Sequence, residues 1–338
     1  MGLENVMHIP RVSIIMPAHN VEDFIGEAIG SIAAQAFSSF ELIIVDDAST
    51  DGTAEVLRKA EELWPLRAEQ LRIIHQANGG ASSARNKGVA EAQGALLGFI
   101  DADDRWSPQT LAHLVAALDA FPESDIACPL YRRINEDGDE VNYLGERVDP
   151  RPLRHAETRQ FNAGETLIST PAQSATGVIV RREAFLAGGG FDTALKSNND
   201  VDCWLRILWT RQSMLVQCPQ AVVDYRIRPA QITSDVRRMQ RGHAQFLKNH
   251  QPLLRDIGLA ARLRHLGLVR AYWALLAARH GDLGSALWYW FSAILLFPGL
   301  ALPGTLGSSA AFAIAKAVLP TLFWQWISKL RRALKRKN

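Results

Sequence analysis

The chain has 338 residues, enough to bury a large hydrophobic core and to form one main domain with an appended region. Its 37 basic and 35 acidic residues leave a net charge of +2, which gives no general indication of nucleic-acid binding. The three cysteines, Cys128, Cys203 and Cys218, are widely spaced, which predicts no disulfide framework or zinc site and favours a reducing compartment. Residues 1–11 lack the apolar core of a secretory signal, so we expect the protein to act in the cytoplasm.

Apolar strands alternate with helices over the first hundred residues. The predicted strands cover residues 12–17, 40–45, 71–75 and 96–100, and the helices between them cover 22–35, 53–62 and 81–92. Strands separated by helices of this length indicate a parallel sheet with right-handed crossovers. Because ligands bind beyond the carboxyl ends of such strands, the polar segments after Val45, His75 and Ile100 should converge on one pocket.

The strand at 96–100 ends in three carboxylates, Asp101, Asp103 and Asp104. Like charges this close repel one another unless a cation lies among them, and Asp101 and Asp103 are spaced to face the same side. We interpret the turn as a site for a metal and a diphosphate. The alternative is a solvated acidic turn before the helix that Ser107 and Pro108 begin, and the turn alone does not decide between the two.

Two other loops carry binding candidates. Asp47 follows the second strand, where its carboxylate could accept a hydrogen bond from the N–H of a pyrimidine base or could cap the next helix. Arg85 follows a Gly79-Gly80 pair and could contact a base or a diphosphate, although a lone arginine on a helix is more often an exposed charge. The glycine pair is not the full glycine-rich fingerprint of a phosphate loop.

Four motifs occur in order, namely SIIMPAHN at 13–20, VDDASTDGT at 45–53, GGASSARNKG at 79–88 and DADD at 101–104. On these motifs, residues 12–108 resemble the nucleotide-sugar half of family 2 glycosyltransferases. The resemblance implies the GT-A fold, an α/β fold with a Rossmann-like, mostly parallel sheet flanked by helices. It also implies a nucleotide-diphosphate sugar as donor and Mn²⁺ or Mg²⁺ as cofactor.

The resemblance assigns roles to residues of these motifs. It implies that Asp47 and Arg85 help to hold the nucleobase, and that Asp101 and Asp103 form the Asp-x-Asp motif, with Asp103 as the direct ligand of the cation. His19 stands where the family usually has a tyrosine, which predicts altered packing around the base rather than a catalytic role. The neighbouring motif residues that complete the predicted donor site are Pro17, Asn20, Asn78 and Asp104.

Asp200 is the predicted catalytic base. The segments GGGFD at 188–192 and NNDVDCWLR at 198–206 complete the resemblance, and the Glu-Asp pair common in the family falls on Asn199-Asp200. The base must take the proton from an acceptor hydroxyl as its oxygen attacks the anomeric carbon opposite the nucleotide. A helix cap is the alternative role for Asp200, and Asp202 is the second candidate for the base. Asn199 removes a charge that the family usually places beside the base.

The remaining segments predict the acceptor side of the domain and a closing element at 223–228, which resembles the Tyr-Arg element that closes the family's domain. Further strands are expected at 124–130 and 174–180, and the polar stretch 132–159 has a hairpin turn at Asp137-Gly138 and should frame the acceptor. Helices are expected to follow residues 108 and 181 and to include the basic residues between 237 and 248. Arg226 or Arg228 could reach the diphosphate. We expect a GT-A domain over 1–230, with its nucleotide-sugar half at about 10–130 and its acceptor half at about 131–230.

The C-terminal region, residues 231–338, is predicted to be helical and to lie against a membrane. Helices are expected at 259–279 and 285–297, and an amphipathic helix with three aromatic residues at 310–330. The segment 286–302 is apolar but interrupted by Pro298 and Gly299, which argues against a span. Aromatic side chains beside the basic residues 329–337 are typical of contact with anionic lipid, although a soluble helical cap is an alternative.

The sequence therefore predicts an inverting glycosyltransferase that uses a glycan or lipid-linked acceptor. We expect it to act at the cytoplasmic face of the membrane, in cell-surface polysaccharide or lipopolysaccharide synthesis. Two other classes remain open. A sugar nucleotidyltransferase shares the architecture, but residues 12–20 lack its glycine-rich signature with a phosphate-binding lysine. A protein that binds sugar nucleotides without turnover, or a scaffold, is the other alternative.

Overall fold

The computed structural model describes residues 9–63, 70–142, 147–148, 157–172, 174–195, 197–228, 235–279 and 282–301. The chain divides into two compact units. The first consists of Met1–Pro229 with Arg241–Leu253, and the second consists of Ala230–Gln240 with Leu254–Asn338.

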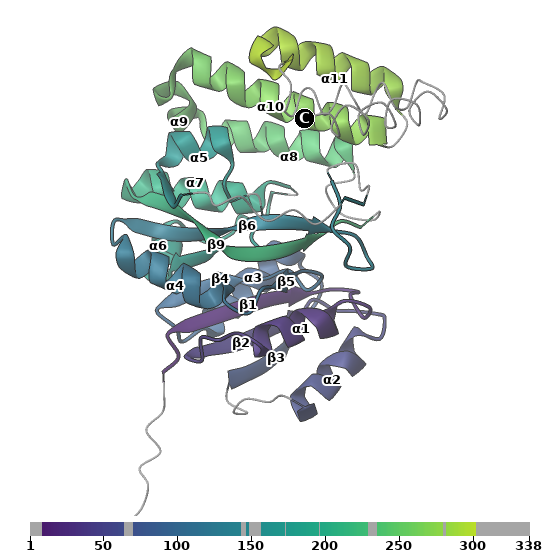
Figure 1. Ribbon diagram of the computed structural model, residues 1–338, viewed down its shortest axis with the longest axis vertical. Coiled ribbons are helices and arrows are strands. Elements are labelled where there is room, and N and C mark those ends of the chain that lie inside the picture. Colours follow the sequence, from purple (N-terminus) through teal and green to yellow (C-terminus); the bar gives the residue numbers. More distant parts are fainter. Residues whose placement is uncertain are drawn as a thin grey trace, which may run out of the picture. The chain divides into compact units, whose positions relative to one another are not determined.

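The first unit begins with the predicted parallel sheet (Figure 1). Its strands are β1 (Val12–Ala18), β2 (Phe40–Asp46), β3 (Leu71–His75) and β4 (Leu96–Phe99), which lie in the order β3-β2-β1-β4 and pair in parallel. The connecting helices are α1 (Ile25–Ala33), α2 (Thr53–Leu63) and α3 (Ala81–Glu91). This order brings the carboxyl ends of the strands to one edge, as the sequence predicts. Only α1 begins late, because a turn occupies residues 22–24.

Strands from later in the chain extend this sheet beyond β4. They are β8 (Ile179–Arg181), β6 (Ser124–Ile134), β9 (Met214–Arg226), β5 (Arg105–Trp106) and β7 (Arg159–Phe161). β8 is antiparallel to β4 and to β6, whereas β9 runs parallel to β6 and antiparallel to β5 and β7. The extension is therefore mixed. The strand expected at 174–180 was too long, because its first half forms turns.

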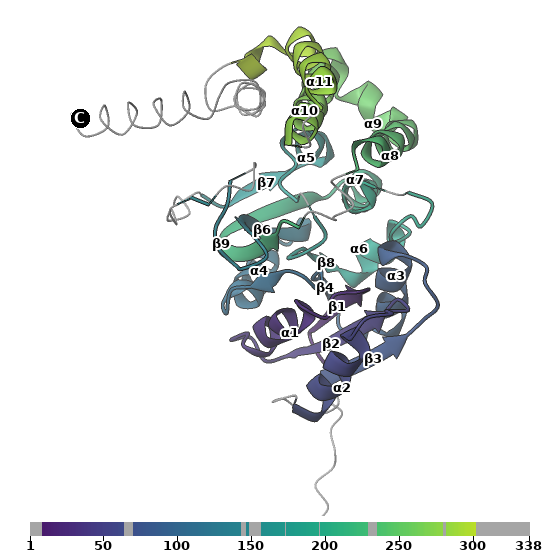
Figure 2. The same cartoon turned by 90° about the vertical axis from the view of Figure 1, so that its right-hand side faces the viewer.

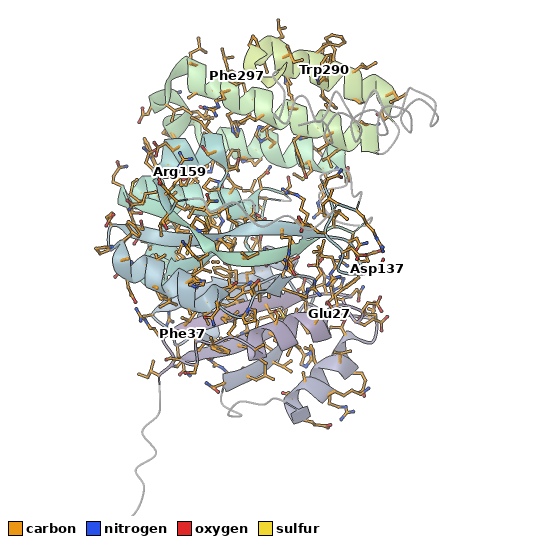
Figure 3. The ribbon with its side chains drawn as sticks, viewed as in Figure 1. Glu27, Phe37, Asp137, Arg159, Trp290 and Phe297 are labelled. Atoms are coloured by element: carbon orange, nitrogen blue, oxygen red, sulfur yellow. The ribbon has the colours of Figure 1, made fainter. Side chains whose placement is uncertain are left out.

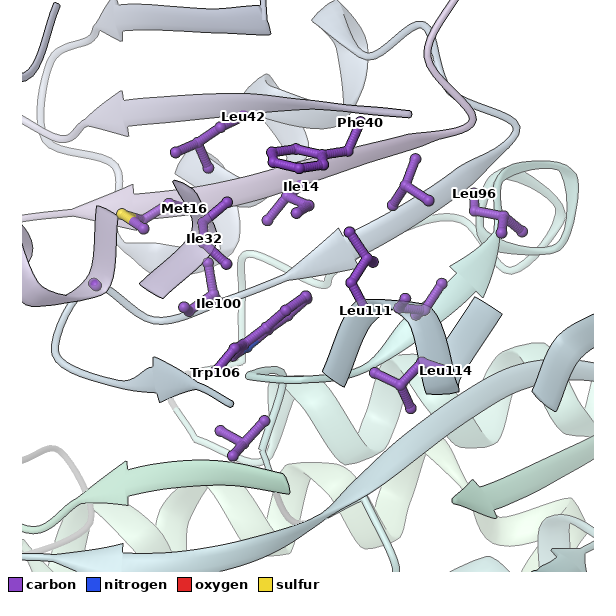
Figure 4. Close-up of a cluster of buried hydrophobic side chains, with 14 of the residues drawn as sticks. Ile14, Met16, Ile32, Phe40, Leu42, Leu96, Ile100, Trp106, Leu111 and Leu114 are labelled. Atoms are coloured by element: carbon purple, nitrogen blue, oxygen red, sulfur yellow. The ribbon is translucent and has the colours of Figure 1, made fainter. Parts of the chain in front are cut away.

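Helices cover both faces of this sheet (Figure 2). α1 and α4 (Thr110–Ala120) lie on one face, whereas α3, α6 (Arg182–Ala187) and α7 (Asn199–Arg211) lie on the other. Ile14, Met16 and Trp106 are buried beneath α1 and α4 in a large apolar cluster (Figure 4). On the opposite face, a Cβ on Gly88 would lie 2.6 Å from Ile15, so only glycine lets α3 approach the sheet this closely. A short helix, α5 (Ala163–Ser169), begins with a capping box.

The last helices confirm the expected helical C-terminal region. They are α8 (Val236–Asn249), α9 (Gln251–Asp256), α10 (Gly258–Arg279) and α11 (Leu283–Leu296), followed by a 3-10 turn (Pro298–Ala301). α10 and α11 pack through Ala271 and Ala293, and Trp273 contacts Tyr289 edge to face. In the described ranges, every helix is too short or too polar to cross a membrane. The predicted membrane-facing segments at 310–330 and 329–337 lie outside the described residues.

Candidate active site

The acidic turn follows β4 at the carboxyl edge of the sheet, where the sequence predicts it. The backbone N–H of Asp104 donates to the carbonyl of Asp101 at 3.0 Å, which closes the turn. The N–H of Asp101 donates to the Thr176 hydroxyl at 3.3 Å. The Ser174 hydroxyl lies 3.4 Å from a carboxylate oxygen of Asp101 and donates to it. The segment just before β8 therefore helps to hold the turn.

Arg85 reaches this turn from α3 and pairs with Asp101. Its side chain is only 7% exposed, and its guanidinium lies 5.4 Å from the ring centroid of Phe191. The simple alternative, an exposed charge on the helix surface, is therefore wrong. The structure brings Arg85 and Asp101 together as predicted, and their pairing places a buried positive charge beside the acidic turn.

Asp200 lies in the first turn of α7, near the same ion pair. Burial raises the pKa of Asp200 to about 6, and the charge of Asp101 adds to the rise, whereas the Val201 N–H and Arg85 partly offset it. The N–H of Val201 donates to Asp200 Oδ1 at 2.8 Å. A carboxylate with a pKa near 6 is ionised at neutral pH and is basic enough to accept a proton from a reacting hydroxyl.

The side chain of Asn199 forms hydrogen bonds to α3 and to the backbone of α7. Its side-chain amide donates to the Ser82 hydroxyl on α3 and its side-chain oxygen accepts from the N–H of Asp200 at 3.1 Å. The residue that replaces the usual glutamate thus ties α7 to α3 and orients the backbone at Asp200. Because an amide is neutral, it adds no like charge that would raise the pKa of Asp200 further.

Asp103 faces Arg228, which follows β9. Arg228 Nη2 lies 2.7 Å from Asp103 Oδ2, and the guanidinium stacks at 5.1 Å over the ring of Phe24. Burial raises the pKa of Asp103, Arg228 partly offsets the rise, and Asp101 adds to it. Of the two arginines considered for the diphosphate, Arg228 is the one that lies at the acidic turn with part of its side chain exposed.

Arg226 is buried and holds the acidic turn in place. Its side chain is 1% exposed, its backbone N–H donates to Asp104 Oδ1 at 2.8 Å, and its Nε donates to the carbonyl of Asp103 at 2.8 Å. The other guanidinium nitrogens donate to the carbonyls of Asn135 and Glu136 and to the carboxylate of Glu27. Of the two arginines predicted as alternatives for the diphosphate, Arg226 has its donors engaged by the protein, and the contact of Arg228 with the diphosphate stays a prediction.

Asp47 binds the glycine pair at the start of α3. Asp47 Oδ1 accepts from the N–H of Gly79 and Oδ2 from that of Gly80, both at 2.7 Å. The side chain of Gln76 also donates to Oδ1 at 2.7 Å. Asp51 instead makes the contact expected of a cap, because its carboxylate accepts from the N–H of Thr53 at the start of α2. Asp47 is thus a brace between two loops, and its contact with a base stays a prediction.

The other predicted donor-site residues lie around this brace. Asn78 Nδ2 donates to the carbonyl of Asp47 at 3.3 Å and lies beside the ring of His19. Asn20 has a φ of 52° and accepts from the N–H of Thr50 at 2.8 Å, which joins the first loop to the second. Pro17 is part of β1, opposite Val45 of β2. These residues shape the loops at the sheet edge.

A family model described as glycosyl transferase family 2 matches residues 13–188, which is more than half of the chain. The chain belongs to glycosyl transferase family 2. Among curated relatives of this glycosyltransferase, EpsJ of Bacillus subtilis is 37% identical over 163 residues, which span 45% of each protein. TuaG of Bacillus subtilis, named for teichuronic acid biosynthesis, is 39% identical over 103 residues, or 30% of this chain and 39% of TuaG. The chain thus matches less than half the length of these relatives.

Solved structures confirm the GT-A fold of this glycosyltransferase. TarS 1–349 of S. aureus, in complex with UDP-GlcNAc, has a TM-score of 0.54 at 19% identity and covers 86% of this chain and 92% of its own. The mannosyltransferase PcManGT of Pyrobaculum calidifontis, in complex with GDP-Man and Mn²⁺, has a TM-score of 0.59 at 23% identity. It covers 91% of this chain and 86% of its own. The chain therefore has the α/β architecture of these GT-A structures.

The acidic turn fits a divalent cation whose coordination shell is completed by oxygen atoms of the substrate. In the part of the chain that the structure describes, no three His, Cys, Asp or Glu side chains gather into a metal cluster. Mg²⁺ and Mn²⁺ need only one or two carboxylates when phosphate oxygens and water supply the rest. Asp104 Oδ2 is buried and lacks a hydrogen-bond partner within the described residues. Burial raises the pKa of Asp104, and the charges of Asp103 and Asp101 raise it further.

Asp202, the second candidate for the base, is held by hydrogen bonds within the first unit. Its side chain is fully buried, with Oδ2 accepting from Arg206 at 2.8 Å and Oδ1 lying 3.0 Å from Nε2 of His250. Burial opposes ionisation, but hydrogen bonds from His250 and Arg206 and their charges lower the pKa of Asp202 overall. Both oxygens are engaged, so Asp202 anchors α7 rather than facing a substrate.

Sequence reasoning missed Tyr131, Ser174 and Thr176, which line or hold the site. The hydroxyl of Tyr131 donates to the carbonyl of Thr176 at 3.1 Å, and Thr176 in turn accepts from Asp101. The signal for Ser174 and Thr176 was the cluster of small residues that ends at Gly177, which has a φ of 80°, whereas Tyr131 on β6 had no such signal. Phe191 lay inside a recognised motif, but its place beneath Arg85 was not predictable from the motif.

Proposed function

We propose that this enzyme transfers a sugar from a nucleotide-diphosphate sugar to a hydroxyl of a glycan or lipid-linked acceptor, with inversion at the anomeric carbon. The observation that carries the proposal is the carboxylate of Asp200, with a pKa of about 6 that responds to Arg85 and Asp101 of the acidic turn. This interaction supports Asp200 as the base beside the residues proposed for the donor. Inversion requires a base on the face of the sugar opposite the leaving group.

In the proposed reaction, Asp200 accepts the proton of the acceptor hydroxyl. The acceptor oxygen forms a bond to the anomeric carbon, and the bond from that carbon to the diphosphate oxygen breaks with its electron pair leaving on the diphosphate. Arg228, which is partly exposed beside Asp103, is proposed to hold the departing diphosphate. A divalent cation held by Asp101 and Asp103 supplies further neutralisation of that charge when it is bound.

The nucleobase is proposed to lie against the loops that Asp47 braces. These loops are flanked by Pro17, Asn20, Asn78 and Arg85. The two asparagines offer side-chain amides at the sheet edge, and Arg85 offers a buried guanidinium. Complexes of the two GT-A neighbours with UDP-GlcNAc and with GDP-Man and Mn²⁺ support a nucleotide-sugar donor and a metal. Asp104 is proposed to support the turn through Arg226 rather than to bind the donor directly.

The cellular role is proposed to be polysaccharide or lipopolysaccharide synthesis at the cytoplasmic face of the membrane. TuaG, named for teichuronic acid biosynthesis, supports a surface-glycan role. Within the second unit, α11 has no charged residue and exposes Trp288, Phe291 and Leu295, spaced along one side of the helix. Exposed aromatic and aliphatic side chains in this pattern suit a peripheral contact with lipid.

The donor half is tested by titration calorimetry of the full chain against UDP, GDP, dTDP and CDP, with and without Mn²⁺. We expect one nucleotide to bind with a Mn²⁺-dependent affinity that Asp103→Ala abolishes. Asp137→Ala is the matched control, because Asp137 is an exposed aspartate in the turn after β6 (Figure 3). Failure of folded protein to bind any nucleotide would overturn the proposal, and binding without donor turnover in the presence of acceptors would favour the scaffold.

A further inference from the structure

A polar hollow lies beside β6, β7 and β9 of the sheet. Its volume is about 360 Å³. Its lining includes Tyr131 and Arg133 of β6, Arg159 and Phe161 of β7, Thr170 after α5 and Gln217 of β9. This volume lies within the range of small-molecule sites and can hold a sugar ring that carries a charged group.

Two arginine side chains line this hollow. Arg133 and Arg159 both line it, and none of its lining residues is an aspartate or glutamate. Arg159 lies 5.3 Å above the ring of Phe161, and its backbone pairs with Gln217 of β9, so the base of its side chain is fixed (Figure 3). Two guanidinium groups in one hollow, with hydroxyl and amide donors around them, match the oxygens of a phosphate or a carboxylate.

The backbone beside the hollow is strained. Thr170 ends α5 in the left-handed region, with a φ of 47° and a ψ of 52°. A β-branched residue rarely adopts this conformation, which costs free energy wherever it occurs. Strain of this kind persists where the surrounding structure needs a side chain in a particular place, and here it sets the Thr170 side chain at the rim of the hollow.

Tyr131 connects the hollow to the candidate active site. Its hydroxyl donates to the carbonyls of Thr176 at 3.1 Å and Ser174 at 3.4 Å, the two residues that hold Asp101. Burial raises the pKa of Tyr131 well above its usual value, and Asp200 is among the carboxylates that raise it further. One wall is thus common to the hollow and to the site of the proposed base.

We propose that this hollow is an acceptor subsite that binds an anionic group of the acceptor, a phosphate or a carboxylate, through Arg133 and Arg159. The inference rests on the proposed transferase function, because the anion would be part of the molecule whose hydroxyl Asp200 deprotonates. An acceptor held there by its charge presents a neighbouring hydroxyl across Tyr131. Binding by charge selects anionic surface glycans or phosphate-linked acceptors over neutral ones.

The test uses ligand-observed NMR titrations of the full chain, with saturating nucleotide and Mn²⁺ to fill the donor site. The probes are glycerol 3-phosphate, methyl glucuronide and neutral methyl glucoside. We expect at least one anionic probe to bind roughly tenfold more tightly than the glucoside, and Arg159→Gln to remove that difference. Arg159→Lys should restore part of it. Arg182→Gln at the start of α6 is the control, because Arg182 lies outside the lining and its side chain forms no ion pair with another described residue.

The outcomes separate the hollow from the donor site. Preference for the phosphate or for the glucuronide identifies the source of the anion, and either supports the subsite. Equal binding of charged and neutral probes, or no binding of the anionic ones, overturns it. A loss of nucleotide affinity in Arg159→Gln also overturns it, because the arginine would then act on the donor site. If no nucleotide binds, the proposed function fails, while titrations of wild type and Arg159→Gln with the anions still decide the subsite.

Discussion

Asp200 and Asp202 lie two residues apart in the first turn of α7, and their pKa values are shifted in opposite directions. Burial dominates at Asp200, whose pKa rises to about 6. At Asp202, hydrogen bonds and charges from His250 and Arg206 outweigh burial. One carboxylate is therefore kept basic at a cost in stability, whereas its neighbour stabilises the helix that carries it.

The first prediction concerns Asp200→Asn and activity. We expect the substitution to lower kcat by roughly 10²- to 10⁴-fold while nucleotide affinity stays within about twofold, because an amide cannot accept the acceptor proton. In the wild type, kcat/KM should fall as the pH drops through about 6, where Asp200 becomes protonated. Steady-state kinetics over pH 5–8, with calorimetry of nucleotide binding, measure both effects. Unchanged turnover in Asp200→Asn would exclude it as the base.

The second prediction compares the stabilities of Asp200→Asn and Asp202→Asn. The raised pKa of Asp200 means that ionisation disfavours folding, so its amide variant should gain roughly 1–3 kcal/mol at pH 7.5 and lose that gain below about pH 4. The lowered pKa of Asp202 means that its ionised form favours folding above the unfolded pKa. Asp202→Asn should therefore cost about 3–5 kcal/mol near neutral pH, less as the pH falls. Urea unfolding at pH 7.5 and below about pH 4 measures the change in unfolding free energy of each variant. At pH 7.5 the two changes should have opposite signs.

The third prediction separates the two arginines of the closing element. Arg226→Lys should cost about 3–5 kcal/mol of unfolding free energy, because one ammonium cannot replace four buried hydrogen-bond contacts of the guanidinium. Arg228→Gln should change stability by only about 1 kcal/mol but weaken binding of the nucleoside diphosphate. Denaturant melts and calorimetry on the two variants distinguish the roles. Comparable stability losses in both would contradict the assignment.

The fourth prediction concerns Ala48, which lies in the loop after β2 with a φ of 57°. An alanine pays a steric cost in this left-handed region that a glycine does not. We expect Ala48→Gly to raise the free energy of unfolding by about 0.5–1 kcal/mol, and Ala48→Val to lower it by more. Thermal unfolding of the wild type, Ala48→Gly and Ala48→Val ranks their stabilities. A destabilised glycine variant would mean that backbone freedom in the unfolded chain outweighs the strain.

Much of the donor half was predictable from sequence because its signals are local. The four apolar strands with their helices fixed the parallel order, and the polar loops at the strand ends gave Asp101, Asp103 and Arg85. Even there, the hydrogen bonds that engage the Asp47 carboxylate come from residues 29 to 33 positions further along the chain. Contacts over such distances leave no periodic pattern in a single sequence.

The later strands and the closing element were harder to predict. β9 spans Met214–Arg226, but its partners in the sheet lie up to 119 positions away along the chain, so only its last residues stood out. Arg226 and Arg228 are chemically alike and two positions apart. Residues two positions apart on an extended chain face the same side, and both guanidinium groups lie over the ring of Phe24. Arg226 is buried at the end of β9, whereas Arg228 lies beyond the strand at the acidic turn, and this difference becomes visible only once the strand's partners are known.

Arg226 also sets an order of assembly. Its hydrogen bonds join Glu27 of α1, the turn at Asp103 and the carbonyls of Asn135 and Glu136, segments that the ribosome releases long before residue 226. During synthesis, the acidic turn thus waits for β9 to insert between β5 and β6 before it acquires its final shape. An excised fragment ending near residue 130 would keep every donor-site motif and still be unable to build a finished site.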